Sequence, residues 1–207
     1  MKPLSTQPGL YPEQETRVII PALTPTIETD RLILRPLELS HAKDIFEYSS
    51  RPDVAIFLLS RKPQTEIQEA EYTINKKTFQ APDASGVTGR RFAFAITQRE
   101  DPTQKAIGIV SINSLMPAPS VGYGMHPDFW RSGYTTEAVA ALIDAWWKLE
   151  RKDVGGDVQP EKLYAGCDKS NVGSVKVLLK NGFQMYEERQ LEGELAALFC
   201  MENPYRI

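Results

Sequence analysis

The chain has 207 residues, of which 42% are apolar, and this is enough for one core of ordinary size. The net charge is -3 with acidic and basic residues interspersed, which argues against nucleic acid as a direct substrate. The sequence has no run of 18 apolar residues, and its start lacks the pattern of a signal peptide. We therefore expect a cytoplasmic protein without a membrane partner. Cys167 and Cys200 match no metal-ligand or disulfide spacing, so we expect no metal.

Residues 1–28 contain five of the fifteen prolines, which exclude a continuous helix or a central strand. We expect a Pro-rich arm over 1–28, disordered or laid on the surface, and a single domain over 29–207. Ser40 and Thr65 are the expected N-caps of the first two helices of that domain. In chain order, apolar periodicity predicts a strand (31–37), two helices (40–50, 64–79), three strands in an antiparallel meander (91–97, 105–115, 120–126), a helix (135–152), a strand (162–167), a helix (171–181) and two strands (183–190, 195–203).

The first candidate for chemistry is "HPDFWRSGYTTEA", residues 126–138, where a strand passes through a glycine turn into a helix. Such a junction presents free backbone N–H groups to an anion at a helix N-terminus. The chain has no P-loop string, and Pro127 stands where the dinucleotide fingerprint needs its third glycine. The turn therefore predicts another kind of phosphate site, although Gly133 alone would also suit a plain tight turn.

The second candidate is "DKSNVGSVKVLLKNGF", which places Asn171 and Ser174 in the first turn of another helix at the end of a strand. Both residue types also serve as ordinary helix caps. Two such junctions after a three-strand meander nevertheless predict a ligand cleft at the carboxyl ends of the strands.

The residues at these two junctions and at the first strand resemble the GCN5-related N-acetyltransferases (GNATs), in particular the branch of ribosomal-protein N-terminal acetylases (RimJ/RimL-like). The matching segments are "TDRLILRPL" (29–37), "GYGMHPDFWRSGYTTEA" (122–138) and "NVGSVKVLLKNGF" (171–183). The resemblance covers about 29–203. It implies an α/β (α+β) fold with a mixed, mostly antiparallel seven-stranded sheet, splayed between strands 4 and 5 and flanked by about four helices.

The resemblance implies acetyl-CoA as co-substrate, held by the strand and turn before the third helix and by Asn171. Tyr123 is a candidate for the acceptor pocket, with simple packing as the alternative. The cofactor-binding residues implied in this way are Met125, His126, Arg131, Ser132, Gly133, Tyr134, Thr135, Thr136 and Asn171.

The implied reaction is direct attack of a primary amine on the thioester. Ser174 is the candidate acid, because many relatives have a tyrosine at the position of Leu178. The backbone N–H of Met125 or a neighbour is the candidate stabiliser of the oxyanion. The branch often carries a glutamate at the position of Ser120, so the base stays open between water, Glu137 and another carboxylate.

The acceptor would be a small-molecule amine or a protein N-terminus, contacted by residues of about 50–65 and 188–196. We expect a monomer or homodimer. The sequence leaves one alternative from another class, a CoA-binding sensor or scaffold that has kept the turn and lost turnover.

Overall fold

The computed structural model describes residues 9–205 apart from 59, 154, 156–158 and 192. Its first sheet is entirely antiparallel and follows the chain order β1, β2, β3, β4, β5. Short loops join β1 to β2, β3 to β4 and β4 to β5, whereas the connection from β2 to β3 carries the first helices. The strands are β1 (Ile27–Glu28), β2 (Leu32–Pro36), β3 (Ala93–Gln98), β4 (Ala106–Ile112) and β5 (Val121–Met125).

The second sheet comes from the C-terminal part of the chain and has the order β6, β8, β7, again antiparallel. Its strands are β6 (Lys162–Asp168), β7 (Gln184–Leu191) and β8 (Glu194–Glu202). The expected hairpin of the last two strands is present, with Leu191 paired to Glu194 across its tip. Gly182, at a φ of 84°, ends the preceding helix as the C-terminal glycine predicts.

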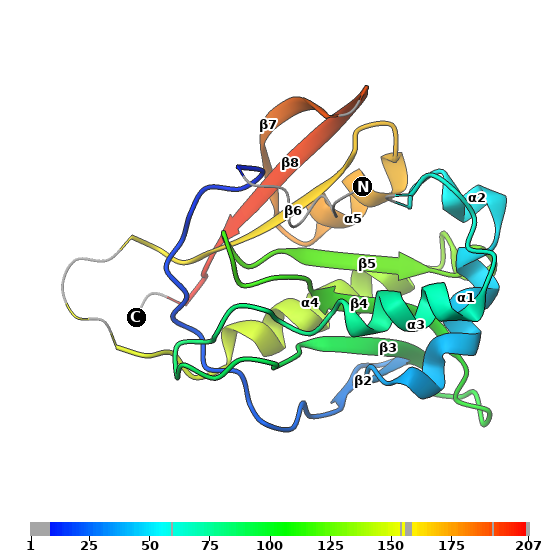
Figure 1. Cartoon of the computed structure of the whole chain (residues 1–207), viewed down its shortest axis with the longest axis horizontal. Coiled ribbons are helices and arrows are strands. Elements are labelled where there is room, and N and C mark those ends of the chain that lie inside the picture. Colours follow the sequence, from blue (N-terminus) through cyan, green and yellow to red (C-terminus); the bar gives the residue numbers. More distant parts are fainter. Residues whose placement is uncertain (1–8, 59, 154, 156–158, 192, 206–207) are drawn as a thin grey trace.

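Helices cover both faces of the first sheet (Figure 1). On one face lie α1 (Ala42–Ser49) and α3 (Ile67–Asn75), joined through α2 (Pro52–Ala55), and on the other lies α4 (Tyr134–Trp147). The helix α5 (Val172–Lys180) contacts α4 and β6. Short 3-10 turns precede α1 (Leu39–His41) and follow β5 (Pro127–Phe129).

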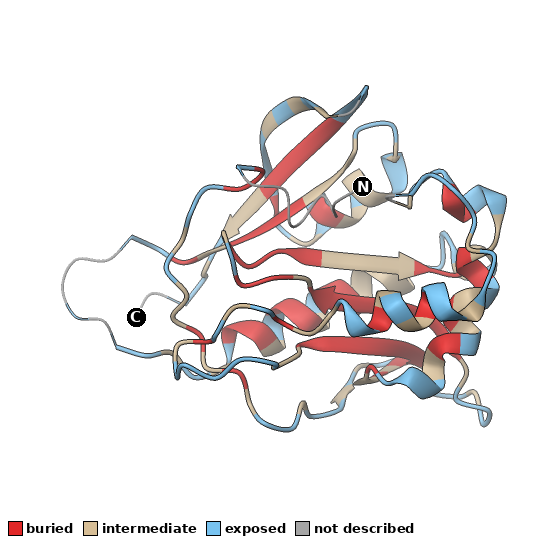
Figure 2. Ribbon diagram, viewed as in Figure 1, coloured by how far each residue is buried: buried red, intermediate tan, exposed pale blue. Residues whose placement is uncertain are grey.

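The largest apolar core lies between the sheets and α4, and it continues across both sheets. All seven residues of β4 are buried, since helices cover this strand on both faces (Figure 2). Trp146 of α4 is fully buried and meets Phe92 edge to face, with ring centroids 5.6 Å apart. A second core, between the first sheet and α1–α3, contains Ile45, Ile74 and Ile109.

The predicted GNAT-type fold is confirmed in its element order and its splay, with three differences. The described chain forms two antiparallel sheets of five and three strands, where one mixed seven-stranded sheet was expected. The strand β1 and the helix α2 are too short for periodicity to detect. The helix caps also differ: His41 rather than Ser40 is the N-cap of α1, and Glu66 rather than Thr65 caps α3 through a capping box with Glu69.

The described part of the arm, residues 9–28, does more than lie on the surface. Val18 and Ile20 are almost fully buried and belong to the largest core. The Ile19 N–H donates to the Glu150 carbonyl at 2.9 Å, and Val18 forms a bridge with Arg151. In the described part of the arm the regular structure is the short edge strand β1, which agrees with the expected absence of a continuous helix or a central strand. The apolar residues between the prolines nevertheless reach the core; residues 1–8 lie outside the described residues.

Candidate functional site

The two sheets meet at one point and then separate. Ser120 forms a parallel bridge with Tyr164, whose N–H donates to the Pro119 carbonyl at 2.9 Å. Beyond this bridge, no hydrogen bond joins β5 to β6 in the described chain, and the two strands diverge toward their C-terminal ends (Figure 1). This gap is the splay that was predicted between the fourth and fifth of the seven expected strands.

The backbone of β5 presents alternate residues to the gap. The His126 N–H donates to the Ile107 carbonyl at 2.8 Å, and the Ser120 carbonyl accepts from Asn113 at 2.7 Å, so even-numbered residues face β4. The backbone groups of Tyr123 and Met125 therefore face the gap. The indole of Trp130 donates to the Met125 carbonyl at 2.8 Å, while the Met125 N–H has no partner in the described chain.

The turn before α4 is an anion-binding arrangement. Gly133 is the N-cap of α4 and has a φ of 80°, a left-handed conformation that glycine adopts without strain. Arg131 also has a positive φ, 63°, and its side chain is exposed. Within the described residues, no hydrogen bond uses the backbone N–H groups of residues 131–136. Together with the helix dipole, these free donors suit a phosphate or pyrophosphate group.

Arg31 and Glu137 hold this turn in place, which the sequence reasoning missed. Arg31 donates to the Glu137 carboxylate (Nε to Oε2, 2.7 Å) and to the Ser132 carbonyl at 3.0 Å, and its guanidinium lies 4.6 Å from the centroid of the Tyr134 ring. Thr29 donates to the same carboxylate at 2.6 Å. The only signal in the sequence was the "TDRL" match at the first strand.

The contacts of Glu137 also bear on its candidacy as the base. Burial alone would raise its pKa, but hydrogen bonds from Thr29 and Arg31 outweigh burial and lower it. A carboxylate with both oxygens occupied and a lowered pKa is a poor proton acceptor. The structure therefore supports a structural role for Glu137.

The first turn of α5 brings Asn171, Ser174 and Tyr123 together. Asn171 is the N-cap, and its Oδ1 accepts from the Ser174 N–H at 3.0 Å, so its side-chain NH2 is the group left for a ligand. The Ser174 hydroxyl has no hydrogen-bond partner among the described residues. Leu178 is buried in the core and supplies no acid.

Tyr123 reaches from β5 across the gap to α5. Its hydroxyl donates to the Ser174 carbonyl at 3.1 Å, and burial raises its pKa. Its side chain lies on the α4 side of the sheet, packed against the core that contains Val121 and Met125. The packing alternative for Tyr123 is thus present in the structure, next to the predicted acid.

The remaining candidates, Tyr134, Thr135 and Thr136, form the first turn of α4. The Tyr134 hydroxyl accepts from Gln98, and the Thr136 carbonyl accepts from Asn181. The groups of Tyr134 and Thr136 that remain for a ligand are therefore their backbone N–H groups at the start of α4. Thr135 lies beside them, half-buried, with no hydrogen bond from its hydroxyl in the described chain.

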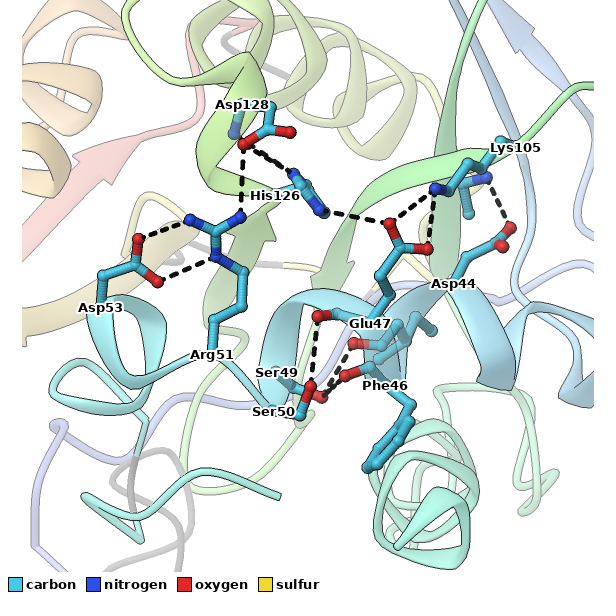
Figure 3. A network of polar contacts seen from close by, with 12 residues as sticks. Asp44, Phe46, Glu47, Ser49, Ser50, Arg51, Asp53, Lys105, His126 and Asp128 are labelled. Atoms are coloured by element: carbon cyan, nitrogen blue, oxygen red, sulfur yellow. Dashed lines mark hydrogen bonds and ion pairs between the residues drawn. The ribbon is translucent and has the colours of Figure 1, made fainter. Parts of the chain in front are cut away.

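His126 has its ring on the α1 side, within the polar network of Figure 3. Its Nδ1 accepts from the Asp128 N–H at 3.2 Å, and its Nε2 lies 3.6 Å from Glu47, which also pairs with Lys105. With Nδ1 accepting, the proton of a neutral ring lies on Nε2, so neither nitrogen is a free base. The backbone N–H of His126 is also used within the sheet, which leaves Met125 as the better candidate for contact with the cofactor arm.

The described part of the chain holds no group of three or more His, Cys, Asp or Glu side chains arranged to bind a metal ion. No helix in the same part is long and apolar enough to cross a membrane.

These features, a splayed pair of strands with an anion-binding turn at its end, define an acetyltransferase of the GNAT class, and the comparisons agree. Residues 31–184 match the model of the acetyltransferase (GNAT) domain, and the chain belongs to this family. It is 28% identical over 163 residues to a Bacillus licheniformis protein described as the uncharacterized N-acetyltransferase p20, covering 77% of this chain and 82% of that protein.

Solved structures show the same fold. A GNAT-family acetyltransferase from Bacillus anthracis has a TM-score of 0.66 at 17% identity, over 87% of this chain and all of that one. The ribosomal L7/L12 α-N-protein acetyltransferase RimL, solved in complex with coenzyme A, has a TM-score of 0.64 at 17% identity, over 86% and 98% of the two chains. The ribosomal-protein-S5-alanine acetyltransferase of Vibrio fischeri has a TM-score of 0.59 at 20% identity, over 87% and 97%.

Proposed function

We propose that the protein transfers an acetyl group from acetyl-CoA to a primary amine by direct attack within a ternary complex. The observation that carries this proposal is the pairing of the strand gap with the free N–H groups of residues 131–136 at its end. These N–H groups would hold the pyrophosphate, and the edge of β5 at Tyr123 and Met125 would pair with the pantetheine amides. The side-chain NH2 of Asn171 would be a further donor from α5.

Acetyl-CoA supplies a thioester carbonyl as electrophile and a thiolate as leaving group. The Met125 N–H faces the gap without a partner and would stabilise negative charge on the carbonyl oxygen. Ser174 would donate the proton that the thiolate takes up, since its hydroxyl lies unpartnered beside the gap. Positioning of the amine by both sheets supplies the rest of the rate enhancement. The proton of the amine would pass to water, because Glu137 is occupied.

The acceptor is a small-molecule amine or a protein N-terminus. Two of the structural neighbours are ribosomal-protein acetyltransferases. They support a place in the RimJ/RimL-like branch and, with it, a protein N-terminus as the acceptor. We also propose that the enzyme works in the cytoplasm as a monomer or homodimer, with neither nucleic acid nor membrane as a partner.

The experiment is a screen of amines and N-terminal peptides for acetyl-CoA consumption, with mass readout of the product. Ser174→Ala should lower turnover by about tenfold or more while the affinity for CoA stays nearly unchanged. Ser40→Ala, in the exposed 3-10 turn before α1, is the matched control and should keep both values. Equal turnover of wild type and Ser174→Ala would remove Ser174 from the mechanism.

A CoA-binding sensor is the second candidate function, favoured by Ser120 in place of the expected glutamate and by the ion-paired Glu137. A sensor would gain thermal stability with CoA by mass action but would consume no acetyl-CoA with any acceptor. A protein with no thermal shift in CoA would contradict both candidates.

A further inference from the structure

A largely covered carboxylate lies across the gap from β5, on the side away from α4. Counting from the bridge between Ser120 and Tyr164, four residues along each parallel strand lead to Gly124 on β5 and Asp168 on β6. The odd-numbered residues of both strands belong to the core under α4. Because side chains alternate along a strand, Gly124 and Asp168 therefore face the opposite side. The side chain of Asp168 is only 10% exposed.

The α1 side of the gap also contains a polar group that has no partner among the described residues. Tyr48 of α1 is almost fully buried, yet its hydroxyl has no hydrogen bond among the described residues. That hydroxyl lies 3.6 Å from the place a Cβ on Gly124 would occupy. A buried hydroxyl and a largely covered carboxylate thus share the face of the gap from which an acceptor can approach the edge of β5.

Asp168 is held by a cation from a different part of the chain. Arg61, in the segment between α2 and α3, donates to its Oδ2 at 2.7 Å, and the Ser170 N–H donates to its Oδ1 at 2.8 Å. Arg61 comes from an exposed stretch, its own φ is 53°, and its guanidinium also contacts the Ile56 carbonyl. Burial would raise the pKa of Asp168, but these hydrogen bonds lower it, so the group stays ionised at neutral pH.

The other charged groups nearby are already paired. In the hairpin of β7 and β8, Glu188 pairs with Lys169 and Glu187 pairs with Arg189. The described residues of this hairpin therefore offer few free carboxylates to a cationic acceptor. Glu47 on α1 pairs with Lys105. Asp168 differs from these carboxylates in its partner: Arg61 belongs to the exposed segment between α2 and α3, 107 positions away in the sequence.

We infer that Asp168 is the residue that binds the cationic amine of the acceptor, and that Arg61 occupies its place until the acceptor arrives. The inference rests on the proposed function and names its acceptor class: an alkyl amine that is an ammonium ion at neutral pH. Asp168 binds and orients this group, with the Tyr48 hydroxyl as a second contact over Gly124. Arg61 is a positioning residue that closes the acceptor side of the gap.

The test uses Asp168→Asn, Arg61→Ala and Arg61→Lys in the full chain, with Arg51→Ala as the matched control. Arg51, the N-cap of α2, pairs with Asp53 and Asp128 and forms no ion pair with Asp168. With an alkyl amine acceptor, Asp168→Asn should raise KM about tenfold or more, while the Kd for CoA stays unchanged. Arg61→Ala should lower KM several-fold, and Arg61→Lys should lie between Arg61→Ala and wild type.

Binding can be measured without turnover. In protein saturated with CoA, 1,4-diaminobutane should raise the melting temperature of Arg61→Ala, whereas Asp168→Asn should show no such shift. Equal losses of kcat/KM and of melting temperature in Asp168→Asn and Arg61→Ala would overturn the inference, because they would mark a purely structural ion pair. No diamine shift in Arg61→Ala would overturn it as well. Failure of CoA itself to stabilise the wild type is a different result, and it contradicts the proposed function.

Discussion

Lys77, just after α3, is a half-buried cation with no ion-pair partner in the described chain, and its replacement should stabilise the protein. Its ammonium donates to Asn113 Oδ1 at 2.5 Å, and no carboxylate of the described chain lies within ion-pair distance. Burial lowers the pKa of Lys77 from 10.5 to about 8. This difference corresponds to a cost of about 3 kcal/mol for the charged form in the folded state. Asn113 Oδ1 would keep a donor after the change, since the Ser111 hydroxyl lies 2.9 Å away.

The variant Lys77→Met removes the charge and retains most of the side-chain volume. After subtraction of about 1 kcal/mol for the lost hydrogen bond, we expect a gain of about 2 kcal/mol, or a rise in Tm of roughly 4–8 °C at pH 7. Below pH 8, both the folded and unfolded wild type carry the proton, so the gain is complete there. Between pH 8 and 10.5, only the unfolded wild type keeps the proton. Wild-type stability therefore rises with pH in this window, and the advantage of the variant shrinks.

The assay is thermal or urea unfolding of wild type and variant at pH 7 and at about pH 10. Lys43→Met, at an exposed position of α1, is the control and should change stability by less than about 0.5 kcal/mol. A Lys77→Met variant that is less stable than wild type at pH 7, or whose advantage does not change with pH, would refute the reasoning.

Two further predictions concern the turn before α4. Gly133→Ala forces a side chain into a left-handed conformation and should cost about 1–2 kcal/mol of stability and weaken CoA binding, measured by calorimetry. Gly182→Ala, at the end of α5 with a φ of 84° and open space around its added Cβ, should cost a similar amount of stability but leave CoA binding nearly unchanged; equal effects on CoA binding would contradict a special role for Gly133. Glu137→Gln weakens the contacts to Arg31 and should lower the Tm by about 2–4 °C and reduce CoA affinity several-fold; unchanged affinity would show that the turn keeps its shape without this ion pair.

Local patterns in the sequence were sufficient to predict the longer helices and strands and the two strand-to-helix junctions. The glycine turn and the Asn171 cap depend on residues a few positions apart, and both are present as predicted. Apolar periodicity could likewise place the meander and α4, because each buries one stripe or face of its residues.

Contacts between distant segments could not be predicted in this way. Arg31 and Glu137 are 106 positions apart, and Arg61 and Asp168 are 107 apart, so no local pattern connects them. The burial of Val18 depends on a bridge to Arg151 that is equally invisible to periodicity. The single sheet was an expectation from the resemblance to the GNAT family, and the apolar pattern could not correct it: apolar strands show that they are buried, but not where a hydrogen-bonded ladder stops.

The solitary bridge between Ser120 and Tyr164 makes the gap a seam between two separately assembled parts of the chain. Each sheet closes its own hydrogen bonds within a contiguous stretch, and the common core under α4 is what joins them. A molecule bound in the gap would contact both sheets at once and so stabilise their association. Amide hydrogens of β5 and β6 should then exchange more slowly in the complex, and the two sheets should lose their protection together rather than one after the other.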